Sequence, residues 1–222
     1  MKSISFCTTC KGRLWQLQQT LPTNVSRLEE GCDIIILDYQ SPDGLKEWLF
    51  ENFDAEIQNG KIKYFSLNEN YNYSSSYAKN LAHKLATGDI LFNLDGDNYI
   101  TGGLIQELRT IKDNEIFLPR YHGNDEGSFG RLGYTKKTFY SLNGYNENIV
   151  GMKGDDGDLR ARCIPLQLIP RHSKYKHVAI QNTQEQKDLY TDVEGLVNPP
   201  LNYPAQWGKA TITDKDGQII NL

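Results

Sequence analysis

The first half of the chain alternates short apolar runs with amphipathic stretches, and no other feature constrains the fold as strongly. Each apolar run has the length of a buried strand, and the stretches between the runs repeat apolar residues at helical spacing. We expect strands over residues 4–8, 33–37, 62–67 and 90–94. Such an alternation is typical of a mostly parallel sheet with helices on both faces. The sequence therefore predicts an α/β fold in which a central, Rossmann-like sheet is flanked by helices.

The four expected helices each place their apolar residues on one face. These residues are Leu14, Leu17 and Leu21; Leu45, Trp48, Leu49 and Phe53; Tyr77, Ala78, Leu81, Ala82 and Leu85; and Leu104, Ile105, Leu108 and Ile111. Ser74 and Thr101 are expected to cap the last two helices. The alternation is lost after residues 115–118. Three prolines within residues 198–207 predict a loop, and Lys215-Asp216-Gly217 predicts a small hairpin near the end of the sequence.

Length and charge exclude several classes of protein. The 222 residues suffice for one substantial core and are few for two independent domains. With 24 basic and 28 acidic residues the formal charge is −4, so no basic field attracts nucleic acid or an anionic membrane. The sequence has neither an 18-residue apolar run nor a signal-peptide pattern. We therefore expect a cytoplasmic protein with no transmembrane segment and no nucleic-acid partner.

The four cysteines are Cys7, Cys10, Cys32 and Cys163. The first two form a C-x-x-C pair, a spacing found in redox centres and in half of many zinc sites. This pair lies at the end of the first expected strand, and the other two cysteines do not form a second pair. Buried free thiols are common core residues in reduced compartments. We expect core thiols here rather than a redox or zinc centre.

Two aspartates flank a glycine, as Asp95-Gly96-Asp97, directly after the strand expected over residues 90–94. Hard cations such as Mg²⁺ and Mn²⁺ prefer oxygen ligands, commonly one or two carboxylates together with phosphate oxygens. In an open α/β sheet the ligand crevice lies outside the carboxyl ends of the strands, where this pair falls. A D-x-D on its own is also common in plain turns. Its place after a strand favours a metal-dependent nucleotide site.

Other nucleotide-binding families with a similar outline lack support in the motifs. A dinucleotide-binding domain carries G-x-G-x-x-G after its first strand, whereas residues 8–13 read Thr-Thr-Cys-Lys-Gly-Arg. The same turn rules out a P-loop and the glycine-rich turn of sugar nucleotidyltransferases. A phosphatase of the haloacid dehalogenase type places its nucleophile after the first strand, but here the aspartate pair follows the fourth. These alternatives are therefore disfavoured.

Five stretches together resemble the inverting nucleotide-sugar glycosyltransferases of the GT-A fold, close to glycosyltransferase family 2 and with a galactosyltransferase-like second half. They are residues 5–13, residues 34–39 with Asp43-Gly44, residues 77–80, Asp95-Gly96-Asp97, and residues 144–147 followed by 154–158. The resemblance covers most of residues 3–180. It implies one domain over residues 1–222, with a nucleotide-binding half to residue 100, an acceptor-binding half over 101–180 and an extension over 181–222.

The resemblance also implies which residues bind the donor. Those expected at the nucleotide are Thr8, Arg13, Asp38, Asp43, Lys79, Asn80 and Asp95. Asp97 is expected to coordinate Mn²⁺ or Mg²⁺, with Asp95 on the ribose or on a metal-bound water. Simpler interpretations exist, because Asp43 follows a proline as helix-capping residues often do and Lys79 could be a solvated charge on a helix flank.

The acidic stretch Gly154-Asp155-Asp156-Gly157-Asp158 resembles the acceptor-side motif of the same family. On that correspondence Asp156 is the base that takes a proton from the acceptor hydroxyl, and Asp155 binds the acceptor. The alternative is a helix amino terminus at which acidic residues oppose the helix dipole, and we expect Asp158 to have only this role.

A third metal ligand is expected from a histidine beyond the acidic stretch. The segment around His177 resembles polypeptide N-acetylgalactosaminyltransferases, and the one around His172 resembles galactosyltransferases; His177 is preferred. The sequence thus predicts a metal-dependent transferase that moves a sugar, expected to be uridine-linked, to a carbohydrate or other hydroxyl acceptor. A non-catalytic protein that binds a nucleotide or sugar is the main alternative. A metal-dependent phosphate-hydrolysing enzyme is a third.

Overall fold

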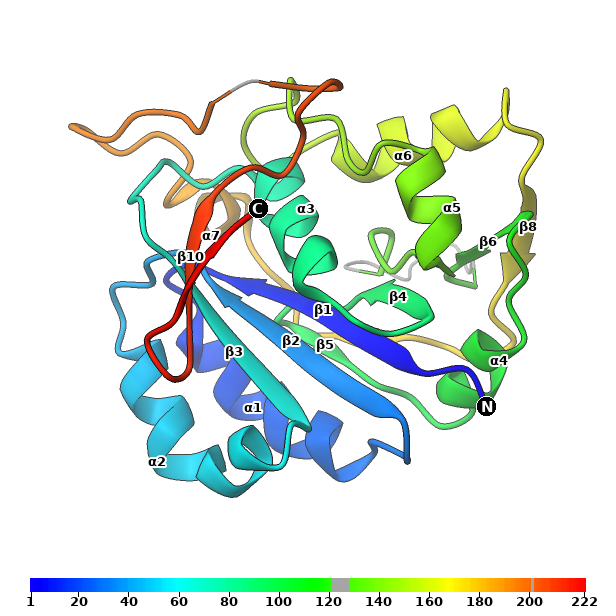
Figure 1. Ribbon diagram of the computed structural model, residues 1–222, viewed down its shortest axis with the longest axis horizontal. Coiled ribbons are helices and arrows are strands. Elements are labelled where there is room, and N and C mark those ends of the chain that lie inside the picture. The colour runs from blue at the N-terminus through cyan, green and yellow to red at the C-terminus, as the bar shows by residue number, and fades with distance from the viewer. Residues whose placement is uncertain (121–127, 201) are drawn as a thin grey trace.

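The structure is a computed structural model that describes residues 1–120, 128–200 and 202–222, and nine strands in these ranges form one sheet (Figure 1). In order across the sheet they are β11 (Ile219–Asn221), β10 (Thr211–Asp214), β3 (Ile62–Leu67), β2 (Cys32–Asp38), β1 (Ile4–Cys10), β4 (Ile90–Asn93), β7 (Gly133–Thr135), β6 (Glu115–Leu118) and β8 (Ile169–His172). The prediction of an α/β fold with a central, mostly parallel sheet is confirmed.

The central strands β3, β2, β1 and β4 are mutually parallel. Their carboxyl ends therefore meet at one edge, and the loops that leave this edge build the site described below. The strand β7 runs antiparallel to both β4 and β6, so the direction of the sheet changes there. Gly133 lies at this reversal, where an added Cβ would stand 3.0 Å from Leu108 and 3.1 Å from Phe92. A side chain at that position would force these two core residues apart.

Helices cover both faces of the sheet, as Figure 1 shows. The bounds of those on one face are α1 (Leu14–Ser26), α2 (Leu45–Gln58) and α4 (Leu104–Arg109); on the other face lie α3 (Ser75–Leu85), α5 (Lys136–Ser141) and α6 (Asp155–Cys163). Each face has its own apolar core. Because successive side chains of a strand point to opposite faces, β1 sends Phe6 into the first core and Cys7 into the second.

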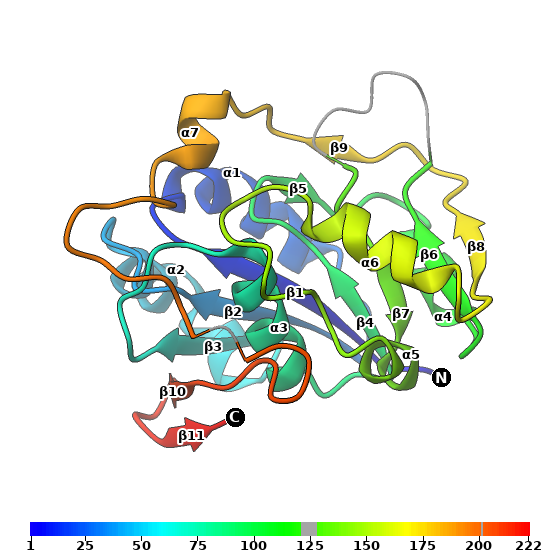
Figure 2. The ribbon, with the colours of Figure 1, turned by 90° about the horizontal axis from the view of Figure 1, so that it is seen from above.

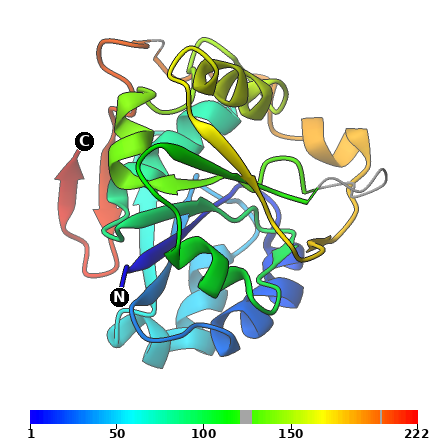
Figure 3. The same ribbon diagram turned by 90° about the vertical axis from the view of Figure 1, so that its right-hand side faces the viewer.

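Two smaller features complete the fold. The strand β9 (Val178–Ala179) pairs with β5 (Asn98–Tyr99), and the chain then continues into the short helix α7 (Gln184–Asp188), near the amino-terminal end of α1 (Figure 2). The hairpin of β10 and β11 lies at the outer edge of the sheet, next to β3 (Figure 3). The predicted hairpin at Lys215-Asp216-Gly217 is thus confirmed, and it also extends the main sheet.

Two expected helix caps do not form. Ser74 stands at the N-cap position of α3, but its buried hydroxyl has no hydrogen-bond partner among the described residues. The N-cap of α4 is Gly103 rather than Thr101, whose hydroxyl is likewise unpartnered within that part of the chain. Asp43 does not cap α2 either: its carboxylate accepts the backbone N–H of Leu14 at 2.7 Å and so caps the start of α1.

The cysteines are buried and free, as expected. Burial raises the pKa of Cys10 to about 12 and that of Cys163 to about 11, which leaves both as inert thiols near neutral pH. Among the helices of the described residues, none has both the length and the apolar character that a membrane crossing requires.

Candidate active site

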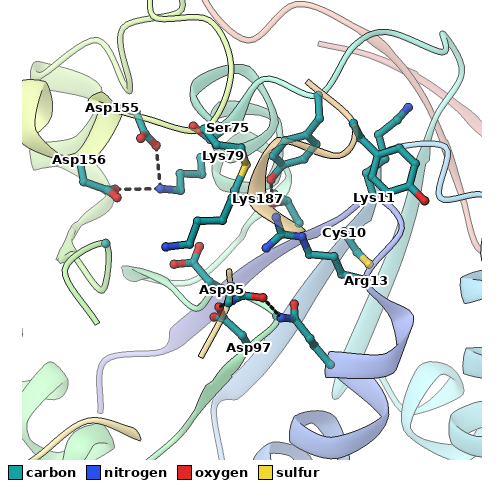
Figure 4. A pocket seen from close by; sticks show the side chains of 18 of the residues that line it. Cys10, Lys11, Arg13, Ser75, Lys79, Asp95, Asp97, Asp155, Asp156 and Lys187 are labelled. Atoms are coloured by element: carbon teal, nitrogen blue, oxygen red, sulfur yellow. Dashed lines mark hydrogen bonds and ion pairs between the residues drawn. The ribbon is translucent and has the colours of Figure 1, made fainter. Parts of the chain in front are cut away.

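A cavity of about 250 Å³ opens where β1 and β4 end (Figure 4). Its walls come from these strand ends, from α1 and α3, from the start of α6 and from the segment around α7. The lining residues are Thr9, Cys10, Lys11, Arg13, Gln16, Tyr73, Ser75, Lys79, Asp95, Gly96, Asp97, Phe129, Gly130, Met152, Asp155, Asp156, Asn182, Lys187 and Tyr190. The cavity therefore holds both acidic motifs that the sequence analysis singled out.

Asp95 and Asp97 form one acidic group of the pocket. Asp95 accepts a 3.0 Å hydrogen bond from the Asn93 amide, and the Asp97 carboxylate accepts one of 2.5 Å from the Asn98 amide. Burial and the charge of Asp95 raise the pKa of Asp97 from 3.8 to about 7. Two carboxylates crowded in this way are a suitable place for a cation.

The segment around α7 forms a wall of the pocket that sequence reasoning missed. Asn182 donates a 2.5 Å hydrogen bond to the Asp97 carboxylate and accepts one from the Gln16 amide. Tyr190 packs on Gly12 so closely that a Cβ on this glycine would lie 1.9 Å from the ring. The sequence did carry one signal for this element, because Thr183 and Gln186 form a capping box at the start of α7.

In addition to Lys79, three cationic side chains line the pocket, and they differ in the groups they contact. The guanidinium of Arg13 donates a 2.9 Å hydrogen bond to the Gln186 carbonyl and therefore connects α1 to α7. The Lys11 ammonium is held by three oxygens, among them the Tyr39 carbonyl at 3.2 Å. The ammonium of Lys187 has no hydrogen bond or ion pair within the described part of the chain. Arg13 and Lys187 are the better placed of the three for an anion.

The second acidic group consists of Asp155 and Asp156, the first two residues of α6. The ammonium of Lys79, on α3, bonds to Asp155 Oδ2 at 2.7 Å and to Asp156 Oδ1 at 2.8 Å. The Asp155 side chain is 3% exposed, whereas that of Asp156 is 18% exposed. The second carboxylate is therefore the more open of the two to a ligand. The role of Asp155 in acceptor binding stays a prediction, which its small exposed fraction does not favour.

Opposing effects set the ionisation of this group. Burial raises the pKa of Asp156 to about 7, although the charge of Lys79 works in the other direction. Burial also acts against the charge of Asp155, but Lys79 outweighs it and lowers the pKa of that carboxyl. Asp155 is thus the permanent anion of the pair, and Asp156 can take up a proton near neutral pH.

Four residues expected at the nucleotide lie outside the lining of the pocket. The Thr8 hydroxyl donates to the Leu94 carbonyl at 2.7 Å. Asp38 accepts the Tyr64 hydroxyl at 2.8 Å and the backbone N–H of Ser41 at 2.7 Å. The remaining two are Asp43, which caps α1, and Asn80, which is fully buried and bonds to Tyr145 and Glu147. These four carry backbone and core hydrogen bonds, which motif matching does not distinguish from ligand contacts.

Neither candidate histidine reaches the pocket. His177 is buried, with its ring centre 6.5 Å from that of Phe117, and burial lowers its pKa to about 3. His172 lies on β8, where its Nδ1 is 3.3 Å from the Pro119 carbonyl oxygen. Asn182 is the residue that the chain brings to Asp97 instead. Asp158 is paired with Arg162 at 2.7 Å on α6, in line with the helix role expected for it.

The oxygens at Asp95 and Asp97 suit a hard divalent cation shared with a phosphate ligand. Within the described ranges, no three histidine, cysteine, aspartate or glutamate side chains lie together as a group that could hold a metal ion. Two carboxylates would leave most coordination positions to other oxygens. A site of this kind would bind a metal weakly until a diphosphate supplied further ligands.

Comparison with known protein families gives one match. The family model described as glycosyl transferase family 2 matches residues 5–161, which include both acidic groups of the pocket. A comparison with curated protein sequences finds no match.

Similar solved structures include the mannosyltransferase PcManGT of Pyrobaculum calidifontis in complex with GDP-Man and Mn²⁺. It is 12% identical with a TM-score of 0.67, over 83% of this chain and 59% of that one. TarS 1–349 of S. aureus in complex with UDP-GlcNAc is 12% identical with a TM-score of 0.64, over 86% and 62%. A mutant of Drosophila β-1,4-galactosyltransferase 7 with manganese, UDP-Gal and xylobiose is 13% identical with a TM-score of 0.60, over 88% and 78%.

At these identities the likeness concerns the fold, which is that of the GT-A glycosyltransferases. The chain spans about three-fifths of the length of the first structures it matches.

Proposed function

The chain belongs to glycosyl transferase family 2, and from this membership we propose that it transfers a sugar from a nucleotide diphosphate to a hydroxyl group of an acceptor. One observation carries the proposal: a single pocket is lined by two separate acidic groups, Asp95 with Asp97 and Asp155 with Asp156. Sugar transfer needs one group for the departing diphosphate and another for the acceptor proton.

On the donor side, Asp95 and Asp97 would hold Mn²⁺ or Mg²⁺ together with the diphosphate. When bound, the cation supplies positive charge that stabilises the leaving group. Arg13 and Lys187 line the same pocket, and Figure 4 shows Arg13 beside the Asp95 and Asp97 pair. Both cations are in a position to bind phosphate oxygens. This part of the proposal assigns no donor contact to Thr8, Asp38, Asp43 or Asn80.

On the acceptor side, Asp156 would act as the base. Its Oδ1 is held by Lys79, and its Oδ2 receives no hydrogen bond from the residues that the structure describes. In the reaction, the acceptor hydroxyl gives its proton to Asp156 while its oxygen attacks the anomeric carbon. The bond from that carbon to the diphosphate breaks, and the electron pair leaves on the diphosphate oxygen. A single displacement of this kind inverts the anomeric carbon.

On this proposal, the two acidic groups would belong to the two expected halves of one domain. The donor-side carboxylates lie before residue 100, and the acceptor-side pair lies between residues 101 and 180. The segment over 182–190 adds to the donor side, so residues beyond 180 would take part in donor binding as well.

We propose a uridine diphosphate sugar as the donor. The TarS and Drosophila structures named above hold uridine nucleotides, whereas the Pyrobaculum one holds GDP-Man, so the base must be tested directly. The test is a thermal-shift panel of UDP, GDP, UDP-sugars and GDP-sugars with Mn²⁺, with Mg²⁺ and with EDTA. A uridine nucleotide should raise the melting temperature only when a divalent cation is present. Equal shifts in EDTA would contradict the metal-dependent site, and a preference for GDP would contradict the uridine assignment.

A further inference from the structure

We propose that Lys79 is a positioning residue that holds Asp156 in place as the acceptor-side base, rather than a ligand of the donor diphosphate. The inference rests on the transferase activity proposed above. It departs from the sequence-based expectation, which placed Lys79 at the nucleotide.

The first support is the geometry of the ammonium. Lys79 is a buried residue of α3, and its side chain is 6% exposed. Two of its three N–H groups face carboxylates of another helix, at 2.7 Å from Asp155 Oδ2 and 2.8 Å from Asp156 Oδ1. Its ammonium also lies 5.1 Å from the centre of the Tyr145 ring. With both ion pairs in place, Lys79 has at most one N–H group left for a phosphate. A closer contact would require it to leave ion pairs that are largely closed to water.

The second support is what these bonds do to Asp156. Because Lys79 holds Oδ1, rotation of the carboxylate is restricted and Oδ2 stays on the side of Gly130. A Cβ on Gly130 would lie 2.5 Å from this oxygen, so any larger residue there would have to displace it. The ammonium thus holds one oxygen of the base, and the bare backbone at Gly130 leaves space for the other.

The third support is the balance of charge around the base. The groups that act on Asp156 are Lys79 from α3, Asp155 on the same helix, Asp95 from the loop after β4 and the ring of Tyr145. Lys79 is the cation in this set. Burial acts against its charge, but Asp155 and Asp156 together raise the pKa of Lys79 well above its ordinary value. Lys79 therefore stays charged while Asp156 gains and loses a proton.

The kinetic test compares Lys79→Met and Lys79→Arg with a control on the same helix, Lys84→Met. Lys84 lies over the Trp207 ring at 4.7 Å and does not line the pocket. With UDP-sugar, Mn²⁺ and an acceptor found by screening, Lys79→Met should lower kcat by about 100-fold while the Kd of UDP with Mn²⁺ changes less than about threefold. Lys79→Arg should restore part of the rate, because a guanidinium can still bind both carboxylates. Lys84→Met should resemble the wild type.

The opposite pattern would overturn the inference. If Lys79→Met weakens UDP binding tenfold or more and leaves kcat within about threefold of the wild type, Lys79 is a donor ligand. If Lys79→Met loses UDP binding and turnover because it no longer folds, a second variant is needed. The double variant Lys79→Met with Asp155→Asn removes the buried cation and one anion at once, so it avoids an unpaired Asp155. It should fold, bind UDP and remain slow.

A second readout separates this inference from the proposed activity. The carboxyl carbon of Asp156 can be followed by ¹³C NMR as the pH is changed, without any turnover. Removal of the neighbouring cation in Lys79→Met should move the titration midpoint of Asp156 upward by about one pH unit or more. An unchanged midpoint would overturn the positioning role even if the wild type is an active transferase. A shifted midpoint in a protein that shows no transfer would confirm that Lys79 acts on Asp156 but contradict the proposed function.

Discussion

The side-chain amide of Asn182 donates a 2.5 Å hydrogen bond to Asp97, a residue 85 positions earlier in the chain. This bond brings the segment that leads into α7 onto the acidic turn after β4. The proposed donor side of the pocket therefore combines a motif that is visible in the sequence with a residue that no motif identifies.

Asn182→Asp should turn the acidic pair into a three-carboxylate group. Because another negative charge would face Asp97, we expect the affinity for Mn²⁺ without nucleotide to rise by roughly tenfold. The measurement is a calorimetric titration with MnCl₂. Asn148→Asp, on an exposed residue outside the pocket lining, is the control for added charge. Unchanged Mn²⁺ affinity in Asn182→Asp would mean that the cation binds away from Asp97.

Asp97→Asn should abolish the metal-dependent stabilisation by UDP. At ligand concentrations of ~100 times the Kd, the wild type should gain about 2.7 kcal/mol from binding. The variant should keep its fold, since it loses one negative charge from a crowded pair, and its melting temperature without ligand should stay near that of the wild type. If the ligand-free variant is unfolded, Asp97 is instead a structural residue of the turn.

Asp156→Asn should separate binding from turnover. The amide keeps the shape of the carboxylate and cannot accept a proton, so transfer should fall by ~10²–10⁴-fold while UDP binding persists. Single-turnover transfer beside a donor titration checks both quantities. Asp158→Asn is the matched control, because its carboxylate pairs with Arg162 on the same helix. A larger loss of rate in Asp158→Asn than in Asp156→Asn would show that Asp156 is not the base.

The rate of transfer should depend on the protonation of Asp156. Its pKa is raised to about 7, and only the ionised form can act as base. We therefore expect kcat to fall as the pH drops below 7 and to level off above it. A pH profile of single-turnover rates checks this expectation, and a flat profile between pH 5.5 and pH 8.5 would contradict it.

His83 should make folding sensitive to acid. It is fully buried against Phe139, and burial lowers its pKa from 6.5 to about 3. The unfolded chain thus binds a proton below pH 6.5 that the folded chain does not bind, so this contribution to stability is lost as the pH falls. Between pH 6.5 and 5, His83→Gln should lose less unfolding free energy than the wild type, by about 2 kcal/mol. Urea titrations at both pH values measure this difference.

The control for this comparison is His172→Gln on the exposed part of β8. Other groups with shifted pKa values, such as Asp97 and Asp156, are the same in the proteins compared and cancel in the difference. If His172→Gln shows the same protection as His83→Gln, the effect does not come from burial at residue 83.

Local sequence patterns were sufficient to predict most of the central sheet. The strand expected over residues 62–67 agrees with β3, and the other three central strands begin and end within two residues of the expected bounds. These strands are long and apolar, so their sequence alone reveals them. The strand β7 was not foreseen, because it has three residues and gains its partners β4 and β6 from other parts of the chain. The terminal hairpin was predicted, but its pairing with β3 was not.

The residues of the candidate site likewise include some that local sequence predicts and others that depend on distant contacts. The carboxylates of Asp95, Asp97 and Asp156 could be placed from sequence, because a motif fixes their position at a strand end or a helix start. The partners of these carboxylates could not be. Asn182 reaches Asp97 through the pairing of two short strands, and Lys79 reaches Asp156 across the space between two helices. Such contacts depend on the packed fold.

The two outermost strands also determine how the sheet meets other molecules. At one edge β11 has three residues; at the other, β8 has four, among them Pro170, which has no N–H to offer. Because the long apolar strands β1, β2 and β3 all lie inside these borders, their backbone groups are already paired. Within the described residues, a second chain therefore finds short and partly blocked edges of the main sheet on which to add a strand. The sheet is in this way protected against edge-to-edge aggregation.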